Sequence, residues 1–233
     1  MEVHFQASSR ATSDYGKDSG KATTMNSVEK PYTIAIVGGI GAGKTWLADR
    51  LETELGCAGR LAQDDFYLDQ SHLSPEKRAR LNFDDPKMID WGRLEQALDD
   101  YQAGGPVLIP SYDLSTHSRR AQARVVAVRP YLLADGLWLL RRSGLRRRFD
   151  FCICIDCPQD VRLARRLARD TTERGRTEQS VREQFAATDQ PMHDKFVAPQ
   201  ARHADMVLRL GFGEEEMLRL VNLCRQRAMF TRR

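Results

Sequence analysis

Gly38-Gly39-Ile40-Gly41-Ala42-Gly43-Lys44-Thr45 matches the phosphate-binding pattern G-x-x-x-x-G-K-[ST], and it constrains the fold of this chain more than any other segment. Residues 32–37 before it are apolar and β-branched, and residues 45–55 after it carry apolar side chains at helical spacing. In such a strand–turn–helix unit, backbone N–H groups converge on phosphate oxygens. Lys44 is expected to reach the terminal phosphates, and the Thr45 hydroxyl to bind magnesium. The motif predicts that the chain binds a nucleoside triphosphate.

The composition is that of an ordinary globular protein. The 233 residues suffice for one sizeable α/β core, and hydrophobic and charged fractions of 41% and 29% are usual for such a core. No apolar run approaches the ~20 residues that a membrane-spanning helix needs. Residues 1–30 are polar and aperiodic, which predicts a disordered leader that can include sequence from an expression vector. Residues 31–233 are predicted to form a single domain.

Five cysteines, in a chain without a secretory signal, favour a reducing compartment, and we expect a cytoplasmic protein. Three of them, Cys152, Cys154 and Cys157, lie in or just after an apolar run of strand length. No second pair of ligands stands elsewhere at zinc spacing. These three are therefore expected to be small buried hydrophobic side chains and not metal ligands.

Hydrophobic strands alternate with amphipathic helices along most of the chain. This order predicts an α/β fold with a P-loop NTPase-type parallel sheet flanked by helices. Residues 106–128 interrupt the alternation, and their apolar arms predict a small antiparallel inserted lobe. The last helix is expected to bury Met217, Leu218, Val221 and Cys224 on one face. The predicted strands are 32–37, about 58–62, 131–135, 150–156 and 205–210, and the predicted helices are 45–55, 91–103, 160–170, about 178–197 and 214–227.

Carboxylates follow two of the predicted strands. Asp64 and Asp65 come after the strand at 58–62, and Asp135 follows residues 131–134. Ligands of open parallel sheets bind at the carboxyl ends of the strands, so these side chains are expected near the phosphates. Asp135 is the natural second magnesium carboxylate, although a helix-capping role remains open for it.

Arginines gather in two clusters, although the net charge is only +4. The first cluster (Arg141, Arg142, Arg146, Arg147 and Arg148) is expected to be the solvated face of a helix. The second runs from Arg162 to Arg176, where arginines three or four residues apart line one helix face. Clusters of this kind suit phosphates or nucleic acid.

Four further segments give the chain a specific resemblance. They are Gln63-Asp64-Asp65-Phe66-Tyr67, Asn82-Phe83-Asp84-Asp85-Pro86, residues 110–119 with Tyr112 and His117, and the arginines from Arg162 to Arg176. In this order and at these separations, residues 32–210 resemble the uridine kinase (uridine-cytidine kinase) family. The resemblance implies a nucleoside kinase domain that phosphorylates the 5′-hydroxyl of uridine or cytidine with ATP and Mg²⁺. It leaves GTP open as a donor, and it implies a homo-oligomer, since members often form tetramers.

The resemblance also implies residue roles. Asp64 matches the catalytic base and magnesium contact, with the adjacent Asp65 as the alternative. Asp84 matches the carboxylate that holds the ribose 2′- and 3′-hydroxyls, against the alternative that Asp84 and Asp85 are turn residues before a proline. The base-recognition positions are Tyr112 and His117, with Phe83 as an apolar wall and Gln184 as a further base contact.

The arginine segment corresponds to a lid in that family. Arg166 and Arg169 match its substrate- and phosphate-contacting positions, and Arg174 and Arg176 flank a glycine that can flex. Lys44, Arg169 and Arg174 are thus expected to act with Asp64 on the migrating phosphoryl group, and Arg166 and Arg176 to contact substrate. Arg162 and Arg165 fall outside this assignment and are expected to be solvated.

Three departures from the family pattern concern the ligand sites. Asp135 stands where glutamate is usual, Leu114 stands where an aromatic ring usually packs on the base, and Trp46 after the phosphate loop is unusual. Related P-loop kinases of nicotinamide riboside, pantothenate or ribulose 5-phosphate remain alternatives, as does a regulator that binds nucleotide or RNA. Nucleic acid is disfavoured as a partner because acids intersperse the arginines and no aromatic stacking platform is evident.

Overall fold

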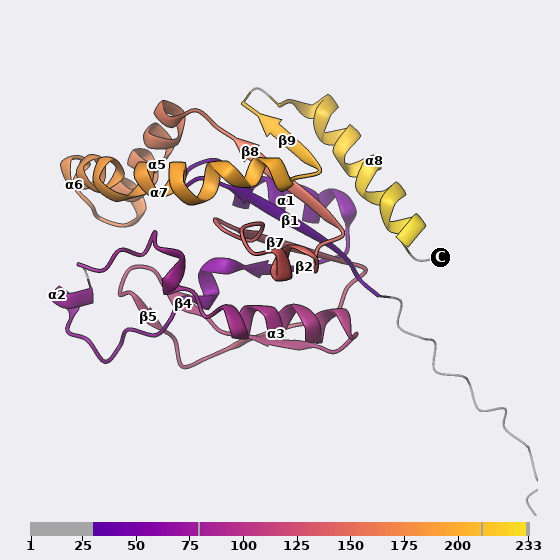
Figure 1. The fold of residues 1–233 in the computed structure, drawn as a ribbon, viewed down its shortest axis with the longest axis horizontal. Coiled ribbons are helices and arrows are strands. Elements are labelled where there is room, and N and C mark those ends of the chain that lie inside the picture. The colour runs from indigo at the N-terminus through magenta and orange to yellow at the C-terminus, as the bar shows by residue number, and fades with distance from the viewer. Residues whose placement is uncertain (1–29, 79, 211, 232–233) are drawn as a thin grey trace, which may run out of the picture.

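The computed structural model describes residues 30–78, 80–210 and 212–231, so the predicted leader lies outside it except for Lys30. Its centre is a parallel sheet, as predicted, and the strands lie in the order β2-β7-β1-β8-β9 (Figure 1). The strands are β1 (Tyr32–Gly38), β2 (Ala58–Ala62), β7 (Tyr131–Gly136), β8 (Phe151–Asp156) and β9 (Met206–Arg209).

Helices cover both faces of the sheet because side chains alternate along each strand. Ile34 and Ile36 of β1 pack towards α1 (Lys44–Leu55) and α8 (Glu214–Thr231). Ala35 and Val37 face the opposite way, towards α3 (Trp91–Gln102). In Figure 1, α8 and α3 lie on opposite sides of the sheet. Within the described residues, no helix is long and apolar enough to cross a membrane.

The antiparallel lobe predicted between residues 106 and 128 is present. β3 (Val107–Ile109) pairs with β6 (Arg124–Val126), and β4 (Tyr112–Asp113) pairs with β5 (Ser118–Arg119). The short helical segments α2 (Pro75–Arg78), η1 (Gln63–Phe66), η2 (Pro86–Met88) and α4 (Ser143–Arg146) complete the connections.

The helix predicted at about 178–197 is divided into segments. α5 (Gln159–Glu173) leads into α6 (Glu178–Gln184). Two wider π-helical turns, η3 (Phe185–Asp189) and η4 (His193–Val197), then flank the short α7 (Gln190–Met192), and η5 (Ala198–His203) ends the run. Pro191 lies inside this run and has no N–H to continue a regular helix, which accounts for a change of winding there.

Two predictions about packing have different outcomes. Leu218, expected on the buried face of α8, is 55% exposed, and Leu220 is the residue that packs into the core. The true stripe is Met217, Leu220, Val221 and Cys224, at the spacing of one helix face. Cys152, Cys154 and Cys157 are buried as predicted, and burial raises the pKa of Cys152 to about 12.

Candidate active site

The phosphate loop connects β1 directly to α1. Gly41 (φ 75°) and Gly43 (φ 101°) adopt left-handed backbone conformations that favour glycine. The Ala42 N–H donates to the carbonyl of Gly39 at 3.1 Å, which closes the turn. Lys44 Nζ donates to the same carbonyl at 3.1 Å, so its ammonium group lies over the loop. Thr45, the second residue of α1, is exposed at the loop.

Two carboxylates come together beside Lys44. The sheet register sets Asp135 opposite both Ile36 of β1 and Ala62 of β2, and Asp64 follows Ala62 by two residues. Desolvation lowers the pKa of Lys44, while Asp64 and Asp135 oppose that shift. Desolvation by the surrounding protein raises the pKa of Asp64, Lys44 lowers it, and Asp135 raises it further. The three groups thus share one electrostatic environment at the carboxyl edge of the sheet.

The helix-capping alternative for Asp135 is wrong. Asp135 lies inside β7, and the next helix, α4, has Arg142 at its N-cap. The Asp135 carboxylate instead accepts from Arg60 Nη2 at 3.4 Å.

The structure separates Asp64 from Asp65. Asp65 accepts from Arg124 Nη2 at 3.2 Å and so turns towards the antiparallel lobe. Asp64 has the cations Lys44 and Arg174 among its charged neighbours, besides Asp135 and Asp65. This difference supports Asp64 over Asp65 as the residue that acts at the phosphates.

Sequence reasoning missed the residue that positions this turn. Gln63 is fully buried, and its Oε1 accepts from the backbone N–H of Trp138 at 2.8 Å. A Cβ on Gly136 would lie 2.5 Å from the Cβ of Gln63, so only glycine allows this approach. The signal was Gln63 itself, a polar residue directly after a buried strand.

The residues present fit a magnesium ion. Asp64, Asp135 and the Thr45 hydroxyl are all oxygen donors, the type that Mg²⁺ prefers, and two carboxylates with a few waters are a usual set for it. Asp64 and Asp135 also repel each other electrostatically, which a divalent cation would relieve.

Asp84 and Asp85 have separate roles in their turn. Asp85 Oδ1 accepts from the Lys87 N–H at 2.9 Å and caps η2, as the turn-residue alternative expects. Asp84 is only 6% exposed. Burial raises the pKa of Asp84, whereas Arg166, a hydrogen bond from Thr188 and Lys44 lower it. Asp85 is therefore a turn residue, as the alternative expects. Asp84 is instead a buried carboxylate between the phosphate loop and α5.

An aromatic cluster lies beside this turn. The rings of Phe83 and His117 stack with centroids 4.1 Å apart and 10° between their planes. Tyr67 contacts both Phe83 and Tyr112, and its hydroxyl donates to the Phe83 carbonyl at 3.0 Å. The Tyr112 hydroxyl and His117 Nδ1 are buried, and neither has a hydrogen-bond partner within the described part of the chain. Such buried polar atoms are usually paired, so this pair is suited to a polar ligand.

The prediction that Arg162 is solvated is wrong, because it is only 2% exposed. Its Nε donates to the Cys157 carbonyl at 3.1 Å and its Nη2 to Gln190 Oε1 at 2.6 Å. Its side chain also packs against Gly39 of the phosphate loop. Arg165 is exposed, as predicted, but donates to the Ala42 carbonyl at 3.3 Å.

The remaining arginines surround buried carboxylates. Arg166 contacts Asp170 and Asp189, and it faces Asp84 electrostatically. Arg169 acts on Lys44 and Arg174 on Asp64 as neighbouring charges, which places both arginines near the phosphate loop.

Gln184 was predicted to contact the base together with Tyr112 and His117, but its described side-chain contact is with an arginine. Its Oε1 accepts from Arg176 Nη1. Arg176, with Arg174, lowers the pKa of His117, after the larger effect of desolvation and that of Arg78. Gln184 is therefore connected to the aromatic cluster through Arg176.

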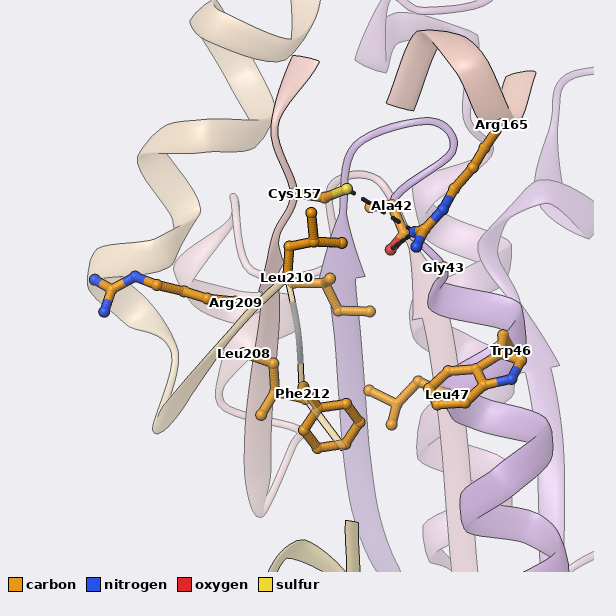
Figure 2. Close-up of a pocket in the computed structure, with 11 residues that line it drawn as sticks. Ala42, Gly43, Trp46, Leu47, Cys157, Arg165, Leu208, Arg209, Leu210 and Phe212 are labelled. Atoms are coloured by element: carbon orange, nitrogen blue, oxygen red, sulfur yellow. Dashed lines mark hydrogen bonds between the residues drawn. The ribbon is translucent and has the colours of Figure 1, made fainter. Parts of the chain in front are cut away.

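A cavity that sequence reasoning did not anticipate opens at the end of the phosphate loop (Figure 2). Its volume is about 460 Å³, and it extends from Ala42 and Gly43 to the residues that follow β9. Trp46 and Phe212 meet edge to face at its rim, with ring centroids 6.3 Å apart. Arg209 points away from it in Figure 2. Apart from Arg165 and Arg209, the lining side chains are apolar or small: Ala42, Gly43, Trp46, Leu47, Ile155, Cys157, Leu208, Leu210 and Phe212.

Sequence comparisons with known proteins give matches over most of the chain. Residues 33–213 match the model of the phosphoribulokinase / uridine kinase family. A uridine kinase from Deinococcus deserti is 37% identical over 195 residues, which cover 83% of this chain and 94% of that protein. A uridine kinase from Chloroflexus aurantiacus is 41% identical over 180 residues, covering 76% of this chain and 86% of that protein.

Solved structures show the same fold. Phosphoribulokinase from Rhodobacter spheroides superposes with a TM-score of 0.59 at 15% identity, covering 77% of this chain and 70% of that chain. D-glycerate 3-kinase from Cryptococcus neoformans gives a TM-score of 0.51 at 18% identity, covering 71% and 78%.

Proposed function

Because the chain belongs to the phosphoribulokinase / uridine kinase family, we propose that residues 31–233 form a nucleoside kinase that transfers a phosphoryl group from ATP to the 5′-hydroxyl of uridine or cytidine. The observation that carries the proposal is the position of Asp64. Its charged neighbours are two cations, Lys44 of the phosphate loop and Arg174 of the arginine segment, and two carboxylates, Asp135 and Asp65. A carboxylate between these two cations is placed to serve a hydroxyl that attacks a bound phosphate.

Asp64 orients the 5′-hydroxyl and accepts its proton as the new P–O bond forms. Desolvation of the Asp64 carboxylate raises its pKa, whereas Lys44 and Arg174 oppose that shift. Lys44, Arg169 and Arg174 supply the positive charge that phosphoryl transfer needs on the transferred group. Mg²⁺ bound through Thr45, Asp64 and Asp135 would neutralise phosphate oxygens when present.

A second group of residues would bind the ribose and the base of the nucleoside that accepts the phosphoryl group. Asp84 offers two oxygens to the cis-diol of a ribose, and Arg166 and Thr188 oppose the rise in its pKa that burial causes. The unpartnered Tyr112 hydroxyl and His117 Nδ1 are available to polar atoms of a pyrimidine, next to the Phe83 ring. Arg176 and Gln184 connect this region to the arginine segment.

The donor side uses the phosphate loop and the cavity beyond it. Phosphates held by the backbone of residues 38–45 leave the nucleoside of ATP next to Ala42 and Gly43, where the cavity begins. Its volume of about 460 Å³ lies within the range of small-molecule sites. Trp46 and Phe212 provide aromatic surface for a purine ring.

The proposal is tested with ATP, Mg²⁺ and a panel of acceptors, comparing wild type with Asp64→Asn. We expect 5′-monophosphates from uridine and cytidine but not from nicotinamide riboside, pantothenate or ribulose 5-phosphate. Asp64→Asn should lower kcat by on the order of 10³-fold while ATP affinity stays within about threefold, because the amide cannot accept the proton. Asp65→Asn, the matched control, should retain activity. Turnover of another acceptor only, or an active Asp64→Asn enzyme, would contradict the assignment.

A further inference from the structure

Helix α5 buries a face made of charged residues. The residues of α5 that are buried are Arg162, Arg166 and Asp170, which are spaced four apart and so lie on one side of the helix. Asp170 is fully buried. Charged side chains are rarely buried unless they are paired, so the partners of this carboxylate decide what it does.

Four guanidinium groups surround the Asp170 carboxylate. Arg169 Nε donates to Oδ1 at 2.8 Å, and Arg166 Nε donates to Oδ2 at 3.2 Å. Arg174 Nη1 lies 3.5 Å from Oδ1, and Arg176 Nη1 lies 3.9 Å from Oδ2. The backbone takes part as well, because the Arg176 N–H donates to the Asp170 carbonyl at 3.1 Å. One residue thus gathers side chains from a helix and from the loop after it.

The cluster keeps an excess of positive charge. Asp189 neutralises part of the charge at Arg166, but no ion pair within the described residues joins Arg169 or Arg174 to an acid other than Asp170. Guanidinium groups this close repel each other, and without a shared carboxylate they would spread into solvent. With it, the excess positive charge stays fixed beside Lys44 and Asp64. A fixed cation stabilises a developing anion better than a mobile one, because no reorganisation is needed.

We propose that Asp170 is a positioning residue whose carboxylate holds Arg169 and Arg174 over the phosphate loop and acts on phosphoryl transfer only through them. Its full burial leaves no surface for contact with a substrate. The loop that carries Arg174 turns at Gly175 (φ 62°) and is anchored back to Asp170 through Arg176. Asp170 therefore fixes the end of the helix and the start of that loop together. This inference rests on the proposed function for the reaction that the arginines serve.

The first test is Asp170→Asn, which keeps the shape of the side chain and removes its charge. With ATP and uridine, we expect kcat to fall on the order of 10²-fold while the KM for uridine changes by less than about threefold, since the arginines act on the transferred group. Asp150→Asn is the matched control for the loss of a structural carboxylate. Asp150 accepts from the N–H and hydroxyl of Thr33, each at 2.8 Å. That variant should lower Tm but leave kcat per folded molecule within about twofold.

A double-mutant cycle then asks whether Asp170 acts through its partner. The fold-decrease in kcat caused by Asp170→Asn should be at least about tenfold smaller in an Arg169→Ala background than in the wild type. Equal losses in both backgrounds would overturn the proposal, as would an Asp170→Asn enzyme with full kcat.

A measurement with Asp170 unchanged tests whether its carboxylate holds the arginines, even if Asp170→Asn does not fold. In ¹⁵N-labelled protein without nucleoside, the Nε–H signals of Arg166 and Arg169 should exchange slowly with solvent, and Arg169→Lys should remove one of them. Rapid exchange of both would overturn the proposal. Because this readout needs no substrate, it separates failure of the inference from failure of the proposed function, which would show as a wild-type enzyme that does not phosphorylate uridine or cytidine.

Discussion

Asp84 and Asp85 are adjacent, yet the chain folds around one carboxylate and leaves the other in a turn. Asp85 caps η2 through the Lys87 N–H. Asp84 is buried within the influence of Arg166, Thr188 and Lys44. A buried carboxylate has two oxygens that can accept hydrogen bonds from a ligand. The difference between the two residues gives a prediction with its own control.

Asp84→Asn should raise the KM for uridine by roughly tenfold or more, because the amide presents one acceptor oxygen in place of two to the ribose diol. Asp85→Asn should change that KM by less than about threefold, since asparagine also caps helices. Steady-state kinetics with uridine and 2′-deoxyuridine check this. An Asp84→Asn enzyme with the wild-type KM for uridine and the wild-type preference between uridine and 2′-deoxyuridine would disprove the ribose contact.

At the scale of elements, the start of α1 and the end of β9 together form the donor cavity. Trp46→Ala should raise the KM for ATP by roughly tenfold, because it removes aromatic surface at the rim. Trp46→Phe keeps a ring next to Phe212 and should stay within about threefold of wild type. The KM for uridine should be the same in both variants. A cavity that does not hold the ATP base would leave the KM for ATP unchanged in Trp46→Ala.

Helix α8 gives a second element-scale prediction, because two leucines two residues apart differ in burial. Leu220 is fully buried and Leu218 is 55% exposed. Leu220→Ala should lower the free energy of unfolding by about 2–4 kcal/mol, through lost burial and the cavity left behind. Leu218→Ala should change it by less than about 0.5 kcal/mol. Urea unfolding of the two variants measures this, and equal effects would mean that α8 does not pack as described.

The same helices show why sequence patterns succeed and fail. Alternating strands and helices were enough to predict the parallel sheet, because hydrophobic periodicity reports burial directly. That rule fails for α5, whose buried face carries Arg162, Arg166 and Asp170. The two arginines have partners distant in the sequence, Gln190 for Arg162 and Asp189 for Arg166. A pattern within one helix cannot report such partners, so Arg162 was wrongly expected to be solvated.

At the scale of the whole molecule, the sequence predicts the site residues that lie close to a motif or a strand end. It does not predict the residues whose role depends on contacts with distant parts of the chain. Lys44 and Asp64 come after β1 and β2, and Asp135 lies near the end of β7. The carboxyl ends of these strands meet at one edge, so the topology rule for parallel sheets anticipates their convergence. The donor cavity needs Trp46 and Phe212, which are far apart in the chain, to meet. Gln63 fixes the turn after β2 by accepting a hydrogen bond from the backbone N–H of Trp138, which is distant in the sequence. Both depend on how the elements pack together, which periodicity does not encode.

That packing also predicts how the stability of the whole molecule depends on pH. His193, the first residue of η4, packs against Gly39 of the phosphate loop, next to Arg162. Desolvation, with a contribution from the Arg162 charge, lowers the pKa of His193 to about 4. Its value in the unfolded chain is near 6.5. Between these values the unfolded state binds more protons than the folded state, so the free energy of unfolding falls as the pH falls below about 6.5.

We therefore expect wild-type stability to drop between pH 7 and pH 5, with His193 contributing roughly 1 kcal/mol after allowance for partial solvent exposure of its ring. His193→Gln cannot take up that proton, so its pH dependence should be weaker by that amount. His72→Gln, at an exposed histidine, should retain the wild-type slope. Urea unfolding of the three proteins at pH 5, 6 and 7 isolates the contribution as a difference. Parallel curves for wild type and His193→Gln would mean that the ring is not held neutral against the phosphate loop.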